Sequence, residues 1–321
     1  RGPPVSCAAV PHFAVTNAAA AGSNVDASAG NQMTKSILHL LLTLVLVLLG
    51  VACAYTVTQE IAWGKLAVIL LTAVSAHVSV NALNEYFDFR IGLDAVTDKT
   101  PFSGGSGALP HNPQQARSVL LLGIASLLVT LAAGLYLVTV TGQELLLPGM
   151  AGLLIVALYT PWMTRSPFLS LVMPGAGFGL IMVIGTAYVL AGQVTLTMVL
   201  ASLAPFFLVN NLLLLNQFPD IRADREHGRR NLPILYGTKV SGIVYMLFNL
   251  SAAAAILAGI LLGVMPLNAV LTVVLLLAAS PIALMAAKRA DDMKRVIPLM
   301  TMNLVVTLVV PAFLSFSLLT L

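Results

Sequence analysis

Long apolar segments recur along this chain of 321 residues, and they constrain its fold more than any other feature of the sequence. A helix needs about 20 consecutive apolar residues to cross the hydrocarbon core of a bilayer. Nine segments reach that length, at residues 37–57, 66–87, 118–141, 145–164, 168–190, 196–217, 240–263, 268–287 and 296–319. Because lipid offers no partner to unpaired backbone groups, such segments cross it as helices. The sequence therefore predicts an all-α polytopic membrane protein, a bundle of about nine transmembrane helices.

The composition supports this prediction. Charged residues make up 9% of the chain, whereas a soluble domain carries about 25%. Hydrophobic residues make up 59%, and the mean hydropathy is +0.96. The two cysteines, Cys7 and Cys53, are too few for a disulfide framework or a thiolate metal site. We expect the lipid bilayer as a partner, and we expect neither a nucleic acid nor an obligate protein partner.

Residues 1–32 differ from the rest of the chain. They are rich in Ala, Gly, Ser and Asn, and they hold no continuous apolar run. A signal peptide would need a basic start and an apolar run of about 7–15 residues. We expect a disordered tail over residues 1–32 and a membrane domain over residues 33–321. Because "MTKSILHLLL" from Met33 resembles a natural start, we hypothesise that the tail is not native, which mass spectrometry of the native N-terminus would test.

The basic residues alternate between the two sides of the predicted bundle. Of the 16 Lys and Arg residues, only Lys65 lies in a loop that follows an odd-numbered helix. The other fifteen lie in the N-terminal region or in the loops after the second, fourth, sixth and eighth helices. Because loops rich in Lys and Arg stay in the cytoplasm, the N-terminus is predicted to be cytoplasmic and the C-terminus outside. Nine of the 12 acidic residues share the inner side.

The stretch "NALNEYFDFRIGLD", residues 81–94, ends the second apolar segment with polar residues. Asn84 and Asp88 are four residues apart, which places them on one face of a helix. Gly92 is predicted to break that helix. We expect Asp94, in the loop that follows, to fold back toward Asp88.

A similar stretch, "NQFPDIRAD" at residues 216–224, follows the sixth apolar segment. Its Asn216, Asp220 and Asp224 repeat the four-residue spacing over two helical turns. Pro219 is predicted to kink this helix and to free a backbone carbonyl. Both stretches are predicted to lie on the same face of the membrane.

Two Asn- and Asp-rich clusters on one membrane face suit a divalent cation. Like charges that lie close together raise one another's pKa and repel. Mg²⁺ takes hard oxygen ligands and is typically shared between one or two carboxylates and substrate phosphates. The predicted metal ligands are Asp88, Asp94, Asp220 and Asp224, and Asn84 and Asn216 complete the predicted catalytic set. The competing interpretation is that these residues cap helix ends and contact lipid headgroups.

Cationic and aromatic residues near both clusters are candidates for binding a diphosphate. Arg suits phosphate because its planar fork donates two parallel hydrogen bonds. The predicted diphosphate ligands are Arg90, Lys99, Arg222, Arg225, Tyr159 and Arg165. Arg229 and Arg230 follow in "DREHGRRN" and are left out of this set. The competing explanations are the positive-inside rule and an interfacial belt of aromatic and snorkelling residues.

Three further features carry less specific signals. The Gly- and Ser-rich residues 100–110 form a loop that presents N–H groups to phosphate or acts as a lid. His77, Asn81, Asn210 and Asn211 are polar positions deeper in two apolar segments. Such groups are often functional, but hydrogen bonds between helices explain them equally well. The small residues of "MPGAGFG", residues 173–179, indicate close helix packing.

The paired motifs resemble those of the UbiA superfamily of intramembrane aromatic prenyltransferases. "NEYFDFRIGLD" is similar to the family's first motif in its Asn-x-x-x-Asp-x-x-x-x-x-Asp form. "NQFPDIRADREHGRRNLPILYG" is similar to the second motif and the segment after it. The resemblance covers about residues 33–321. It implies a helical membrane bundle, an isoprenyl diphosphate donor, Mg²⁺, and transfer of the prenyl group, an alkyl group other than methyl, to an aromatic acceptor.

Within that family, the spacing from Asp88 to Asp94 resembles the 1,4-dihydroxy-2-naphthoate prenyltransferases of menaquinone synthesis. 4-Hydroxybenzoate prenyltransferases, haem O synthase and chlorophyll synthase usually carry a tighter first motif and an Arg-Thr…Arg-Pro stretch, where this chain has "DKTPFSGGSG". The resemblance implies a naphthoate acceptor and leaves 4-hydroxybenzoate, homogentisate, a tetrapyrrole or a glycerol phosphate lipid open. It implies a bacterial or archaeal cytoplasmic membrane, with the active site facing the cytoplasm.

The resemblance also implies a mechanism. Mg²⁺ held by the four carboxylates engages the diphosphate, and Arg and Lys stabilise it as the allylic C–O bond ionises. The resulting cation alkylates an electron-rich ring carbon, and a naphthoate acceptor loses its carboxylate during the overall reaction. The ring is activated enough to need no strong general base. The prenyl tail lies among the apolar helices.

Three other functions compete with this interpretation. A secondary transporter with inverted repeats would place its site near the bilayer midplane, whereas the acidic residues here lie at the inner helix ends. A CDP-alcohol phosphotransferase would carry one dense motif of four acidic residues around a Gly–Ala–Arg core, which the sequence lacks. A non-catalytic assembly subunit would tolerate loss of Asp88 or Asp220.

Overall fold

The computed structural model describes residues 40–97, 99–289 and 292–320, and within these ranges it holds helices and loops but no β-strand. The predicted tail over residues 1–32 lies outside the described residues. In the described part of the chain, eight helices are long and apolar enough to cross a membrane, and a shorter apolar helix covers Gln143–Leu158. This confirms the predicted all-α membrane fold. The number of crossings and the sidedness of the two ends stay predictions.

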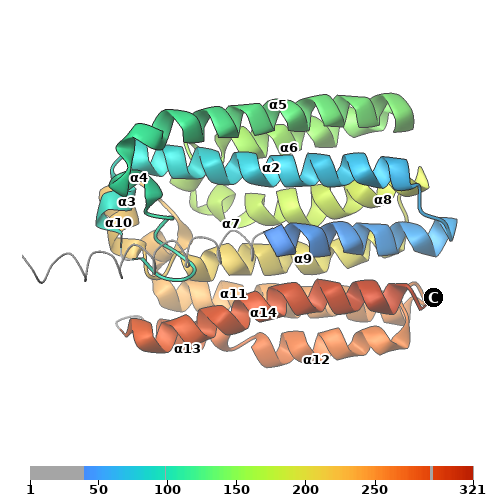
Figure 1. The fold of residues 1–321 in the computed structure, drawn as a ribbon. Coiled ribbons are helices and arrows are strands. Elements are labelled where there is room, and N and C mark those ends of the chain that lie inside the picture. Colours follow the sequence, from blue (N-terminus) through green and yellow to red (C-terminus); the bar gives the residue numbers. More distant parts are fainter. Residues whose placement is uncertain (1–39, 98, 290–291, 321) are drawn as a thin grey trace, which may run out of the picture.

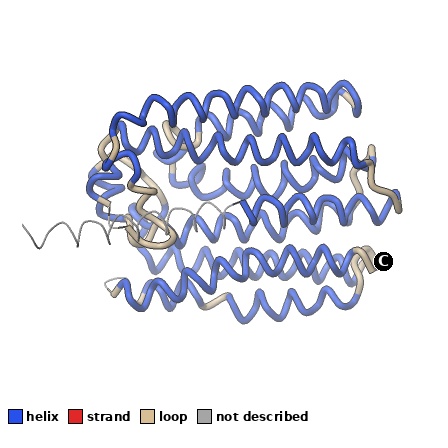
Figure 2. Tube along the Cα trace, in the orientation of Figure 1, coloured by secondary structure: helices blue, strands red, loops and turns tan. Residues whose placement is uncertain are grey.

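The helices run roughly side by side in one bundle (Figure 1), and loops join them at both ends (Figure 2). The bundle contains the helix Leu40–Thr58, α2 (Trp63–Arg90), α5 (Ala116–Thr141), α6 (Leu146–Leu158), α7 (Pro167–Gly175), α8 (Val183–Ala191), α9 (Leu196–Asn216), α11 (Leu232–Leu261), α12 (Val270–Ala279), α13 (Ile282–Ala287) and α14 (Met293–Leu318). Short helices α3 (Leu93–Val96), α4 (Ala108–His111) and α10 (Ile221–Glu226) gather at the end opposite the C-terminus (Figure 1). Single 3₁₀ turns lie at Pro113–Gln115, Gln143–Leu145, Met163–Arg165 and Leu267–Ala269.

Helix α9 forms the centre of the bundle, and α5 lies at its edge. In the most apolar stretch of each, 67% of the residues of α9 are buried inside the protein, compared with 11% for the helix that contains α5. The outward face of α5 carries Leu121, Leu128 and Leu135, all exposed. Because the exposed face is apolar from Leu121 to Leu135, that part of it suits contact with lipid.

Glycine allows α9 and the segment 167–191 to approach closely. A Cβ atom on Gly175 would lie 2.1 Å from the backbone oxygen of Phe206, and one on Gly179 would lie 2.3 Å from its nitrogen. Residues Ala176–Met182 form a π-helical segment between α7 and α8, after Pro174. A proline removes a helical hydrogen bond, which is one cause of such local rewinding. The predicted packing role of residues 173–179 agrees with this geometry.

A buried polar network fastens α9, α11 and α14 together. Asn211 donates through Nδ2 to the backbone oxygen of Tyr245 at 3.0 Å and to Oδ1 of Asn249 at 2.9 Å. The Tyr245 hydroxyl donates to Oδ1 of Asn303 at 2.9 Å, and Nδ2 of Asn303 donates to the oxygen of Asn211 at 3.3 Å. Of the two explanations left open for Asn210 and Asn211, hydrogen bonding between helices therefore describes Asn211.

Several predicted helix boundaries were wrong for identifiable reasons. Gly237 takes a non-helical conformation with φ of 80°, so α11 is two helices joined at a kink, and the helical residues before Gly237 were missing from the predicted helix 240–263. The predicted helix 268–287 is divided between α12 and α13 where Pro281 intervenes. The predicted helix 145–164 ends at Leu158 and continues as turns.

Candidate active site

The first motif folds as its glycine predicts. Helix α2 ends at Arg90, Gly92 takes the left-handed conformation with φ of 80°, and α3 begins at Leu93. This reversal buries Asp94 within the electrostatic reach of Asp88, whose charge contributes to raising the pKa of Asp94. The predicted return of Asp94 toward Asp88 is confirmed, although Asp94 lies on a short helix rather than in a loop.

The second motif departs from the predicted continuous helix. Helix α9 ends at Asn216, turns occupy residues 217–220, and α10 begins at Ile221. Pro219 lies in this break. Proline has no N–H group to donate to a helical hydrogen bond, and a residue outside a helix needs none. Asp224 resumes the helical pattern, since its N–H donates to the oxygen of Asp220 at 2.8 Å. Asn216, Asp220 and Asp224 nevertheless line the same cavity.

Arg229 joins the two motifs. Its Nη2 donates to Oδ1 of Asp88, and its Nη1 donates to Oδ1 of Asp224 at 3.1 Å. The other oxygen of Asp224 accepts from Nδ2 of Asn231 at 3.0 Å. The Arg229 side chain is only 18% exposed, so its charge depends on these partners. The charges of Asp88 and Asp224 outweigh the effect of burial and raise the pKa of Arg229.

Arg229 was absent from the predicted diphosphate ligands. It lies five residues after Asp224, and Gly228, with φ of 79°, turns the chain back so that the Arg229 N–H donates to the oxygen of Asp224 at 3.0 Å. Asn231 then caps α11 by accepting from the N–H of Ile234 at 3.1 Å. A glycine three residues before a helix cap, Gly228 before Asn231, is the sequence signal that could have indicated this turn.

The Gly- and Ser-rich loop covers the carboxylates of both motifs. The Ser103 hydroxyl and the Gly104 N–H group donate hydrogen bonds to Asp220. Ser106 donates to Glu85 through its hydroxyl and, at 3.2 Å, through its N–H. Gly105 passes so close to Asp94 that a Cβ atom there would lie 2.4 Å from Oδ1 of the carboxylate. The loop therefore binds carboxylates in this structure.

The site contains buried oxygens that lack partners among the described residues. These are Asp94 Oδ2, Asn216 Oδ1 and Asp220 Oδ1. Burial, followed by the nearby charges of Glu85 and Asp88, raises the pKa of Asp94 to about 7. Burial, followed by the charge of Asp224, raises the pKa of Asp220 to about 7. Unpaired oxygens with raised pKa values fit a place that a cation would fill.

The donor set fits Mg²⁺ rather than a metal held by protein ligands alone. Among residues 40–97, 99–289 and 292–320, no three His, Cys, Asp or Glu side chains converge on one metal position. Mg²⁺ is usually bound by one or two carboxylates and completed by water and substrate phosphate. The residues present match that mode of binding, with hard oxygen atoms and no thiolate or imidazole ligand.

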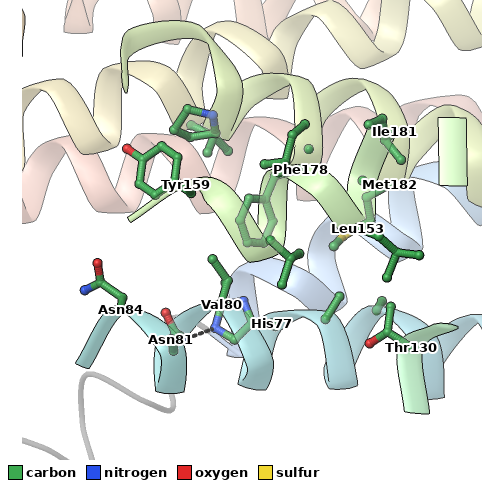
Figure 3. Close-up of a pocket in the computed structure, with 18 of the residues that line it drawn as sticks. His77, Val80, Asn81, Asn84, Thr130, Leu153, Tyr159, Phe178, Ile181 and Met182 are labelled. Carbon is green, nitrogen blue, oxygen red and sulfur yellow. Dashed lines mark hydrogen bonds between the residues drawn. The ribbon is translucent and has the colours of Figure 1, made fainter. Parts of the chain in front are cut away.

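A cavity of about 830 Å³ extends from this charged cluster into the bundle. Its α2 wall is one stripe with helical spacing, made of Ile69, Thr72, Ala73, Ala76, His77, Val80, Asn81, Asn84, Glu85 and Asp88. From Ile69 to Asp88 the stripe spans 19 residues (88 − 69), or about 28 Å. Figure 3 shows His77, Asn81 and Asn84 along this wall, with Tyr159 and Phe178 across from them. The cavity is charged at one end and apolar over most of its length.

The structure brings only part of the predicted diphosphate set to this cavity. Tyr159 lines it, and Asn84 is held there by the Thr160 hydroxyl at 2.9 Å. Lys99 is exposed and lies beside Asp94 in a smaller recess. Four predicted ligands lie on the exposed surface and do not line the cavity, namely Arg90, Arg165, Arg222 and Arg225.

Comparison with known proteins gives matches to one family. A family model described as the UbiA prenyltransferase family matches residues 32–305. The 1,4-dihydroxy-2-naphthoate octaprenyltransferase of Bacillus subtilis (strain 168) is 28% identical over 173 residues, which are 53% of this chain and 54% of that protein. The match thus spans about half the length of this curated relative.

Solved structures share the fold. A UbiA homologue from Archaeoglobus fulgidus bound to DMAPP and Mg²⁺ superposes with a TM-score of 0.62 at 15% identity, over 91% of this chain and 99% of that one. An apo UbiA homologue from Aeropyrum pernix K1 gives 0.65 at 18% identity, over 85% and 96%. A digeranylgeranylglyceryl phosphate synthase gives 0.62 at 16% identity, over 89% and 99%.

Proposed function

The chain belongs to the UbiA prenyltransferase family, and we propose that it transfers a polyprenyl group from an isoprenyl diphosphate to 1,4-dihydroxy-2-naphthoate in the membrane, a step of menaquinone biosynthesis. The observation that carries the proposal is a single cavity that joins a buried carboxylate cluster to a long apolar channel. An isoprenyl diphosphate has the same division, with a charged head and an apolar tail.

Asp88, Asp220 and Asp224 at the charged end, together with Asp94 in the smaller recess, would hold Mg²⁺ ions, with one or two carboxylates to each ion. The unpaired oxygens of Asp94 and Asp220 support this assignment. When bound, Mg²⁺ supplies positive charge that neutralises a departing diphosphate. Asn84 and Asn216 line the same end and orient the donor head, Asn84 through its bond from Thr160 and Asn216 through its unpaired Oδ1.

Arg229 takes the role that the sequence assigned to other cations. Its guanidinium faces the cavity and already donates to two carboxylates, so it can turn the same fork toward phosphate oxygens. Charge-assisted hydrogen bonds of this kind stabilise the diphosphate as the allylic C–O bond ionises. Lys99, beside Asp94, adds positive charge at the rim.

The apolar part of the cavity would hold the prenyl chain and shield the allylic cation from water. Its walls include Leu153, Ile181 and Met182, which Figure 3 shows around the deeper part of the cavity. Excluding water favours alkylation of the acceptor ring over hydrolysis of the cation.

The naphthoate acceptor is supported by the Asp88 to Asp94 spacing and by the curated relative. Such a ring is electron-rich enough to be alkylated without a strong base, and its carboxylate leaves as carbon dioxide in the overall reaction. We further propose that the enzyme lies in a bacterial or archaeal cytoplasmic membrane. The distribution of Lys and Arg supports an active site that faces the cytoplasm.

The test is transfer by the full chain purified in detergent with Mg²⁺ and radiolabelled farnesyl or geranylgeranyl diphosphate. Naphthoate and 4-hydroxybenzoate are supplied separately, and Asp88→Ala and Asp220→Ala are the controls. We expect a lipid-soluble product from the naphthoate that requires Mg²⁺ and is lost in both variants. Product from 4-hydroxybenzoate alone would overturn the acceptor, and no transfer to either would overturn the proposed reaction.

A further inference from the structure

Polar residues line the cavity well beyond the carboxylate cluster. On α2, Asn81 lies seven residues from Asp88 and His77 lies eleven, which correspond to about 10 Å and 16 Å along the helix axis. Val80, Ala76 and Ala73 beside them are apolar. A diphosphate bound at Asp88 leaves the exposed side chain of Asn81 and the buried side chain of His77 beside the space next to it.

Asn81 is held by a defined chain of hydrogen bonds. Its Nδ2 donates to Nε2 of His77 at 2.7 Å. An amide nitrogen only donates, so Nε2 carries no proton, and the Nδ1–H group of His77 donates to Oγ1 of Thr43 at 3.0 Å. Thr43, on the helix Leu40–Thr58, is fully buried, and His77 is 7% exposed. With Nδ2 of Asn81 bonded to His77, Oδ1 is turned away from His77.

The end that faces the cavity is the oxygen. Figure 3 shows it pointing from α2 into the space between the two walls. Oδ1 of Asn81 accepts no hydrogen bond from any residue in the described part of the chain. A hydroxyl group of a bound molecule is the kind of donor that would complete it.

An aromatic residue closes the space opposite this oxygen. Phe178 lies in the π-helical segment Ala176–Met182, lines the cavity, and packs edge-on against the His77 ring with a centroid distance of 5.6 Å. Segments of this kind often mark functional sites. The pair bounds a slot with an apolar face on one side and a hydrogen-bond acceptor on the other, which suits a flat hydroxylated ring.

We propose that Oδ1 of Asn81 accepts a hydrogen bond from a ring hydroxyl of the aromatic acceptor, with His77 and Thr43 as positioning residues. This inference rests on the proposed function and adds where the acceptor binds. Asn81 is far enough from Asp88 to leave room for the diphosphate, and near enough for a ring that must reach the first prenyl carbon. A hydroxyl on that ring then selects hydroxylated acceptors over ring systems without one.

The first experiment separates the two substrates. Asn81→Leu keeps the approximate size and removes the acceptor atom. We expect its KM for 1,4-dihydroxy-2-naphthoate to rise about tenfold, the usual worth of one hydrogen bond, while the KM for farnesyl diphosphate changes less than about twofold. An equal effect on both constants would overturn the proposal, because a general structural defect affects both.

A second measurement pairs Asn81 with the hydroxyl itself. Monomethyl ethers of the naphthoate, each lacking one hydroxyl donor, are compared with the parent compound by the shift they cause in the melting temperature of the Mg²⁺-loaded protein. We expect one ether to bind about tenfold more weakly to the wild type and no more weakly than the parent to Asn81→Leu. If both ethers keep the same penalty in the variant, Asn81 is not the partner.

The positioning residues are tested by rescue. His77→Leu removes the acceptor of the Asn81 amide and should raise the naphthoate KM. His77→Gln keeps a side-chain oxygen near the Nε2 position, so its KM should lie close to the wild-type value. Thr43→Val should act in the same direction as His77→Leu. Thr139→Val is the matched control, since that hydroxyl is exposed and bonds within its own helix. Failure of rescue by His77→Gln would overturn the positioning role.

The binding measurement also distinguishes this inference from the proposed function. If the wild type makes no prenylated product, the function is overturned. The naphthoate and 4-hydroxybenzoate melting shifts still report whether an aromatic acceptor binds and whether Asn81→Leu weakens it. If neither compound shifts the wild type, the acceptor slot is overturned as well.

Discussion

Asp88 and Asp224 share one cation, because the guanidinium of Arg229 donates to a carboxylate oxygen of each. The two carboxylates belong to different helices, α2 and α10, and are 136 residues apart in the chain (224 − 88). A single buried side chain thus holds the two halves of the site at a fixed separation.

Replacing Arg229 should therefore affect stability and activity together. In Arg229→Ala, two buried carboxylates lose their cation, which typically destabilises a protein by about 3–5 kcal/mol. Turnover should fall about 10²- to 10³-fold, the usual effect of removing one electrostatic stabiliser of a leaving group. Arg229→Lys should recover only part of the stability and part of the turnover, since an ammonium group cannot donate to both carboxylates with the fork geometry of a guanidinium. Thermal unfolding in detergent and transfer assays measure these effects.

The matched control is Arg222→Ala, because the Arg222 side chain is 92% exposed and its ion-pair partner among the described residues is Glu226. We expect less than about a twofold change in turnover. A loss in Arg222→Ala as large as in Arg229→Ala would instead support the diphosphate role that the sequence assigned to Arg222.

Stability without Mg²⁺ should fall as the pH rises. Asp94 and Asp220 have pKa values raised from 3.8 to about 7 in the folded protein. Between these two pH values the folded state therefore binds more protons than the unfolded state. The contribution of the two carboxyl groups to the free energy of unfolding is full below pH 3.8 and is lost as the pH rises past about 7. The melting temperature of the metal-free protein should drop between pH 5.5 and pH 8, an interval of about 2.5 pH units that includes the raised pKa values.

Mg²⁺ should reverse this trend, because it must displace the protons from its ligands. The Mg²⁺-induced rise in melting temperature should be larger at about pH 8 than at about pH 6, with apparent affinity changing about tenfold per pH unit for each proton displaced. Replacing Asp94 and Asp220 with Asn should remove the dependence. An Mg²⁺ effect of equal size at both pH values would contradict these assignments.

The length of the prenyl chain should respond to Gly185. This residue lies on α8 and lines the cavity, and a Cβ atom added to it meets nothing within 4 Å. Gly185→Leu should narrow the apolar channel without disturbing the fold. We expect kcat/KM for geranylgeranyl diphosphate to fall about tenfold relative to farnesyl diphosphate. Gly64→Leu is the control, because Gly64 also has free space but lies outside the cavity.

Gly105 should tolerate no side chain. Its φ is 65°, and a Cβ atom would lie 2.4 Å from Oδ1 of Asp94. Gly105→Ala should cost the backbone strain of about 1–2 kcal/mol and also displace a predicted metal ligand, weakening Mg²⁺ binding about 10- to 100-fold. Gly263→Ala carries similar strain, with φ of 69° and free space around the added atom. It should lower the melting temperature and leave Mg²⁺ binding intact.

Hydropathy predicted the helices of this protein well because membrane spans must be long and apolar. Hydropathy alone did not locate the interruptions at proline and glycine, although Gly92 and Pro219 marked two of them in the sequence. The division at Pro281 and the π-helical segment after Pro174 leave the surrounding residues as apolar as an unbroken helix would. Their positions depend on packing against neighbouring helices, which a periodic pattern does not contain.

The carboxylates were predictable and their cation was not. Asn84 and Asp88 share a face because they are four apart on one helix. Arg222 lies two residues from both Asp220 and Asp224, a spacing that places side chains on different sides of a helix. That rule could have excluded Arg222 from the cavity. Arg229 reaches Asp88 through the turn at Gly228 and the packing of α10 against α3, which are tertiary features.

The hydrogen-bonded network of Asn211, Tyr245, Asn249 and Asn303 also gives the bundle a mechanical asymmetry. The hydrogen bonds of this network must break together before α9 and α11 can separate. The amide protons of these two helices should therefore exchange with solvent most slowly. Helix α5 is held mainly by apolar contact, which lipid can replace at little cost. The second motif follows α9, which belongs to this network. The first motif ends α2, which packs against α5. We therefore expect amide protons of α5 to exchange faster than those of α9 and α11, while the bond from Arg229 to Asp88 keeps the end of α2 in place.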